Sequence, residues 1–93
     1  MNADEFVNWL GIELHRLVQI PIDSNRFEAT RDLVNRAVSM LIGLPPSEQK
    51  QVVGAIITAH QSGRIGDYRI PYDIRDEFDM IEEVLATIEG LID

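Results

Sequence analysis

Apolar residues recur at intervals of three and four positions along most of the 93-residue chain, which is the spacing of one face of an α-helix. The pattern predicts helices over about residues 3–19, 26–42, 46–62 and 73–92, with a short extended arm between the last two. Proline or glycine follows each of the first three segments and ends the helical pattern there. We therefore expect residues 1–93 to form a single all-α, four-helix bundle-like domain.

Start signals and apolar stripes define the first two helices. Asn2 and Glu5 have the spacing of a capping box at the start of the first helix. Residues 23–25, Asp-Ser-Asn, offer three adjacent N-cap candidates for the second helix. Its stripe starts at Phe27, and we expect it to face the core through Thr30, Val34, Ala37 and Leu41.

The third helix and the segment after it are less regular. Gly54 lies in the middle of the third helix, where we expect it to permit the close approach of a neighbouring backbone. Residues 64–72 then alternate apolar and polar side chains, which predicts a short extended arm. Pro71 argues against a central strand. We expect the arm to fold back over the open end of the bundle.

The last helix has the clearest pattern in the chain, with Asp73 as its expected N-cap. Its apolar seam has alternating spacings of four and three: Ile74, Phe78, Ile81, Leu85, Ile88 and Ile92. Ordering a helix backbone costs about 1–2 kcal/mol per residue, so the seam has to be buried against a partner. A parallel coiled-coil dimer is disfavoured, because it would place Glu77 opposite Glu82. Packing within the domain is preferred, and an antiparallel or bundle-type homodimer is the alternative.

Charge is distributed unevenly along the sequence. The net charge is −8, and residues 67–93 hold nine acidic side chains against two arginines. This asymmetry argues against direct binding to nucleic acid or to an anionic membrane, and it favours either a basic protein partner or solubility alone. Cysteine is absent, the N-terminal segment is acidic and no apolar stretch is long enough to span a membrane. We expect a soluble, cytoplasmic protein.

Two sets of residues are candidates for partner binding. The acidic set is Asp76, Asp79, Glu82 and Glu83, on or beside the side of the last helix opposite its seam. Such a face is either solvated or a docking surface for a basic protein. The aromatic set is Trp9, Tyr68 and Tyr72, for which packing at the edge of the core is the alternative role.

Catalytic, metal and cofactor sites are not expected. Neither His15 nor His60 follows an acidic residue at the Glu-x-x-His spacing of carboxylate-bridged metal bundles. We expect both to be boundary residues with one hydrogen bond. Ser39 and Ser62 lack the glycine-rich surroundings of a nucleophile elbow, and the single lysine, Lys50, belongs to no phosphate-binding loop.

These observations predict a non-enzymatic protein-binding module. Its most concrete form is a small acidic inhibitor, antitoxin or immunity-type protein that presents the last helix to a basic partner. The alternative is a structural or adaptor subunit that self-associates through apolar helical surfaces, with the acidic residues serving only solubility.

Overall fold

Four α-helices make up most of the described chain, as the apolar spacing predicts. The computed structural model describes residues 1–22 and 24–92, except for the side chains of Ser24 and Ile92. The helices are α1 (Ala3–Leu17), α2 (Ser24–Ile42), α3 (Pro46–Ser62) and α4 (Arg75–Ile92). The fold is therefore all-α and bundle-like.

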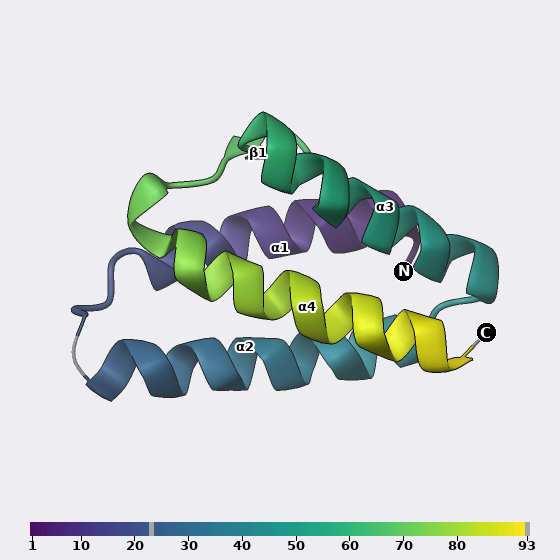
Figure 1. Cartoon of the computed structure of the whole chain (residues 1–93), viewed down its shortest axis with the longest axis horizontal. Helices are drawn as coiled ribbons and strands as arrows, with labels where there is room; N and C mark the ends of the chain where they lie inside the picture. The colour runs from purple at the N-terminus through teal and green to yellow at the C-terminus, as the bar shows by residue number, and fades with distance from the viewer. Residues whose placement is uncertain (23, 93) are drawn as a thin grey trace.

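Consecutive helices run in opposite directions (Figure 1). α1 packs on α2 and α3, and α4 packs on the other side of the same two helices. α1 and α4 thus lie on a diagonal of the bundle. Four of the six predicted seam residues, Ile74, Phe78, Ile81 and Leu85, are almost fully buried within the domain. Ile88 is partly buried, and the side chain of Ile92 lies outside the described part.

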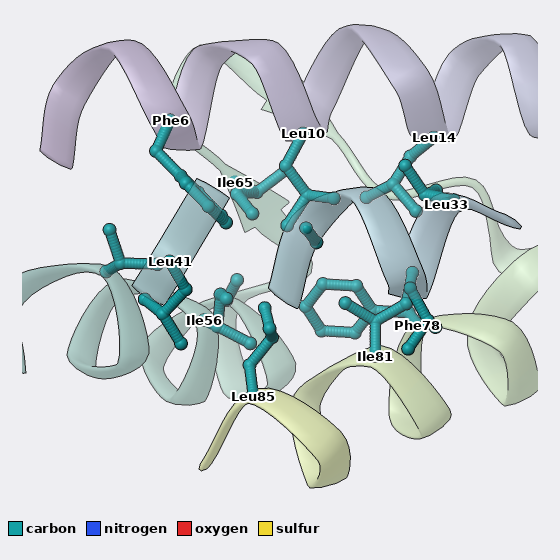
Figure 2. Close-up of a cluster of buried hydrophobic side chains, with 14 of the residues drawn as sticks. Phe6, Leu10, Leu14, Leu33, Leu41, Ile56, Ile65, Phe78, Ile81 and Leu85 are labelled. Carbon is teal, nitrogen blue, oxygen red and sulfur yellow. The ribbon is translucent and has the colours of Figure 1, made fainter. Parts of the chain in front are cut away.

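The core is a continuous cluster of side chains from every helix. Figure 2 shows Phe6 and Leu10 of α1 facing Ile81 and Leu85 of α4, with residues of α2 and α3 filling the space between them. Close packing of this kind makes each large-to-small change in the cluster costly.

The predicted extended arm is a two-stranded antiparallel hairpin made of β1 (Arg64–Ile65) and β2 (Tyr68–Arg69). Gly66, at the first position of its two-residue turn, has φ +57°, which fits a type II′ turn. The hairpin packs along α1 and α3, and Ile65 enters the core (Figure 2). The expectation that the arm covers the open end of the bundle is therefore wrong.

Gly11 explains why the hairpin can lie so close to α1. A Cβ atom at Gly11 would lie 2.6 Å from Cδ2 of Tyr68, well inside van der Waals contact. Gly54, by contrast, has no atom within 4 Å of its Cβ position. The close approach that we expected at Gly54 thus occurs at Gly11 instead.

Several predicted boundaries are shifted by a few residues. α1 ends at Leu17 with Val18 as its C-cap, and α2 begins at Ser24. A 3₁₀ turn, η1 (Tyr72–Ile74), precedes α4, so Asp73 is not the N-cap of that helix. Asn2 caps α1 as predicted, with its Oδ1 accepting the Glu5 N–H at 2.8 Å. Of the cap candidates for α2, Asp23 and the side chain of Ser24 lie outside the described part.

Two buried polar side chains hold the connections between helices. Arg26 donates from Nε to the Ile20 carbonyl oxygen at 2.8 Å and from Nη2 to the Val18 carbonyl oxygen at 3.1 Å. Gln49, near the start of α3, donates to the carbonyl oxygens of Leu41 and Leu44 at 3.0 and 2.9 Å. Both side chains donate to carbonyl groups at or just beyond the C-terminal end of the preceding helix.

Candidate functional site

The four predicted acidic residues do not form one uniform face. Asp76, Asp79 and Glu83 are exposed, whereas Glu82 is partly covered by its neighbours. Asp79 and Glu82 lean toward α3, where Oδ1 of Asp79 lies 2.9 Å from Nδ1 of His60. The surface that remains open to a partner is therefore centred on Asp76 and Glu83.

His60 connects α3 to the acidic side of α4. Its Nδ1 atom is also 3.5 Å from Oε2 of Glu82, and that oxygen is buried without a hydrogen-bond partner. His60 is half-exposed and holds two carboxylates near a single ring nitrogen. His15 makes a different contact, with its ring centroid 5.5 Å from that of Tyr68.

A small hollow lies between the start of α2 and the start of α4. We call it the apolar–acidic pocket; its volume is about 240 Å³, and its lining includes Ile22, Phe27, Met80, Asp76 and Glu77. Phe27 is 60% exposed here, so the expectation that it packs in the core is wrong. Thr30, one turn along the helix on the same predicted stripe, is buried as expected.

Arg26 forms the buried wall of this pocket. Besides its two carbonyl contacts, its Nη1 donates to Oδ2 of Asp73 at 3.3 Å. The one side chain therefore joins the end of α1, the start of α2 and the turn before α4. This arrangement fixes how far apart the two walls of the pocket lie.

The three predicted aromatic residues have different environments. Trp9 is partly buried, with its ring edge against Phe6 and the Arg36 guanidinium 5.8 Å from its centroid. Tyr68 is partly buried against Gly11. Only Tyr72 of the three is open to a partner, with 84% of its surface exposed and the Arg75 guanidinium 5.7 Å from its ring centroid.

A second and larger hollow lies on the other side of α4 and was not foreseen from the sequence. It has a volume of about 700 Å³ and is bounded by the end of α3, the hairpin and the first turn of α4. Arg64, Arg69 and Arg75 line it, and we call it the basic groove. The sequence did not predict this groove, because residues 67–93 are acidic on balance. The net charge of a segment does not show which of its side chains lie close together in the folded protein.

Among the described residues, no three His, Asp or Glu side chains are placed to hold a metal ion. Ser62 and His60 both border the basic groove, but residues two apart on a helix do not face each other. The Ser62 hydroxyl instead lies 3.3 Å from both the amide nitrogen and the carbonyl oxygen of Arg64.

Within the described part, no helix is long and apolar enough to cross a membrane. Comparison with known proteins found no matching family model, no matching curated protein and no matching solved structure.

Proposed function

We propose that this protein is a non-enzymatic binding module that captures a basic segment of another protein in the apolar–acidic pocket. The observation that carries the proposal is the meeting of Ile22, Phe27 and Met80, all exposed, with the carboxylates of Asp76 and Glu77 in one hollow. The acidic helix predicted from sequence supplies one wall, and the start of α2 supplies the other.

The apolar side chains of the pocket would supply most of the binding free energy. Full burial of a side chain such as Phe is worth about 1.5–3 kcal/mol, and Phe27 and Ile22 are both mostly exposed. A large apolar side chain inserted between them would be desolvated together with both residues. Such central apolar anchors commonly dominate the binding energy of protein interfaces.

The acidic part selects the partner. Asp76 and Glu77 border the apolar contact, and Glu83 is exposed farther along the same helix. Lysine or arginine side chains that flank the apolar anchor would face these carboxylates. Such complementarity increases the association rate and penalises acidic competitors. The expected ligand is therefore a basic, amphipathic peptide segment, as an inhibitor- or antitoxin-type protein would recognise.

A second copy of this chain is a weaker candidate for the same pocket. In a two-fold symmetric dimer each patch faces itself, which would bring Asp76 and Glu77 toward their own counterparts. The self-associating adaptor function remains the alternative because Phe27 and Ile22 are exposed on one surface. Light scattering over a range of concentrations separates the two, since only the adaptor function requires a dimer.

Selection from a random peptide display library tests the proposal directly, because it does not require the natural partner to be identified first. We expect enriched peptides to combine several lysine or arginine residues with one large apolar residue. In NMR titrations such a peptide should shift the amide signals of residues 24–30 and 76–83. Acidic or neutral consensus sequences, an absence of enrichment, or shifts on other surfaces would refute the proposal.

Two matched variants assign the binding to the pocket. Phe27→Ser removes the apolar contact, and Asp76→Lys with Glu77→Lys reverses the rim charge; each should weaken peptide binding at least about tenfold. Asp4→Lys with Glu5→Lys makes the same charge change on the first turn of α1 and serves as the control. Equal losses in the control would show that net charge, and not the pocket, governs binding.

A further inference from the structure

The basic groove concentrates positive charge in an otherwise acidic protein. Three of the eight basic side chains of the sequence, Arg64, Arg69 and Arg75, line it together with two histidines. Among the described residues of its lining, Asp79 is the one carboxylate, and it lies against His60. The local charge is thus opposite in sign to the net charge of −8.

The hairpin places two of these arginines in an unfavourable position. Arg64 and Arg69 are directly opposite each other in the antiparallel pair, so their side chains leave the same face. Ile65 and Tyr68 occupy the inner face and pack on the bundle. Like charges directly opposite on paired strands destabilise a hairpin. Among the described residues, no ion pair to a carboxylate offsets this repulsion.

Additional donors surround the pair. The Arg75 guanidinium lies near Tyr72 at the edge of the groove, and His15 and His60 line it from α1 and α3. Guanidinium groups present planar sets of N–H donors that match phosphate oxygens. Three guanidinium groups supply more N–H donors than the single carboxylate of the lining could accept, whereas a phosphate group has three acceptor oxygens and up to two charges.

We propose that the basic groove binds the phosphate group of a small phosphorylated molecule. The inference does not depend on the proposed function, because it concerns the opposite side of α4. The volume of about 700 Å³ lies within the range of roughly 300–1,000 Å³ common for small-molecule sites. A bound phosphate would neutralise the repulsion between Arg64 and Arg69.

The surroundings favour a small anion over a polyanion. A neighbouring hollow shares Tyr72 and Arg75 with the basic groove and is also lined by Asp73, Asp76 and Asp79. A nucleic-acid strand or an anionic membrane surface would extend over these carboxylates and be repelled. A single phosphate group held at Arg64 and Arg69 would cover much less of this acidic surface.

Binding can be tested with glucose 6-phosphate as the probe and glucose as the uncharged control, in NMR titrations and calorimetry at low salt. We expect saturable shifts of residues 60–75 with glucose 6-phosphate, weakening as salt is added, and none with glucose. The absence of saturable shifts in this region would overturn the proposal. Tighter binding to a DNA duplex or to phosphatidic acid vesicles than to glucose 6-phosphate would show that the groove prefers a polyanion. That result would also overturn the proposal.

Arg69→Thr tests the groove directly, and Arg31→Ala removes the same charge from the exposed surface of α2 as a control. We expect Arg69→Thr to weaken glucose 6-phosphate binding about tenfold or more, without lowering the melting temperature of the ligand-free protein. Arg31→Ala should bind as the wild type does. Equal losses in both variants, or a concentration-dependent dimer of the wild type that Arg69→Thr dissociates, would refute the proposal.

Discussion

The two hollows beside the start of α4 share this helix as one wall but differ in their other walls and in the chemistry of their linings. The apolar–acidic pocket joins α4 to α2 and combines exposed apolar side chains with carboxylates. The basic groove joins α4 to α3 and the hairpin and collects arginines. Arg75 lines the groove, whereas Glu77, two residues later, lines the pocket. Residues two apart on a helix point to different sides, so one short segment serves two surfaces of opposite charge.

Local charge differs in sign between the two surfaces, although the net charge of the protein is −8. At an ionic strength of 0.1 M, charges more than about 10 Å apart are largely screened from one another. A groove with three arginines should therefore attract anions in spite of the net charge. The two surfaces should respond independently to mutation, and the following variants test this from the largest expected effect to the smallest.

Replacement of Arg26 should have the largest effect, because this buried side chain joins the end of α1, the start of α2 and the turn before α4. Arg26→Leu removes two hydrogen bonds to the carbonyl oxygens of Val18 and Ile20 and should lower the free energy of unfolding by about 2–4 kcal/mol. Urea denaturation measures the loss. Asp73→Asn is the control, since its carboxylate is largely exposed and should contribute no more than about 1 kcal/mol. If Asp73→Asn lowers the free energy of unfolding by more than this, the ion pair with Asp73 contributes more to the stability than expected.

Gly11→Ala should disturb the basic groove and leave the apolar–acidic pocket intact. The added methyl group collides with the ring and Cβ of Tyr68, and overpacking of this kind costs about 1–3 kcal/mol. The gain in helix propensity offsets up to about 1 kcal/mol of this cost. We expect a lower melting temperature and changed amide shifts in residues 64–69.

Gly54→Ala is the matched control for Gly11→Ala. It makes the same chemical change at an exposed helical position with open space around it. It should therefore stabilise the protein by about 0.5–1 kcal/mol. Stabilisation by both alanine substitutions would show that the hairpin does not depend on Gly11.

Arg69→Thr should slightly raise the stability of the ligand-free protein. It removes the like-charge pair with Arg64, a change worth roughly 0.2–1 kcal/mol for cross-strand neighbours. Thermal unfolding with and without glucose 6-phosphate measures the effect. Destabilisation of the ligand-free variant would indicate that Arg69 has a structural role in the hairpin.

Phe27→Ser should have the smallest effect on stability, within about 0.5 kcal/mol, because the ring is mostly exposed. The variant should lose binding of the selected basic peptide while binding of glucose 6-phosphate stays unchanged. Arg69→Thr should show the reverse pattern. Loss of both activities in either variant would mean that the two surfaces are coupled.

The sequence predicted the helices well and the surfaces only in part. Three-four apolar spacing located every helix to within a few residues, since each helix buries one face whatever its neighbours are. The same rule failed at Phe27, which is 60% exposed in the apolar–acidic pocket, although Arg26 and Thr30 close to it are buried. Periodicity identifies a face of a helix but does not show which residues of that face the neighbouring helices cover.

The acidic set was predicted as a face, and the structure divides it. Asp76 and Glu83 are exposed, while Asp79 and Glu82 lie close to His60 on α3. No pattern within α4 indicates this division, because it depends on the register of α4 against α3. Arg26 was also missed, since a charged side chain near the start of a helix is ordinarily a surface residue.

What the sequence determined by itself is the all-α class, the helix positions and the burial of the α4 seam, because these follow from local spacing and the cost of exposing apolar surface. Only the tertiary structure decided that the segment after α3 is a hairpin docked on Gly11, that Arg64 and Arg69 lie opposite each other, and that acidic residues of α4 meet Phe27. The docking on Gly11 and the meeting of α4 with Phe27 join residues far apart in the chain, and the Arg64–Arg69 pair depends on the register of the hairpin. In each case the chemistry arises from proximity in space.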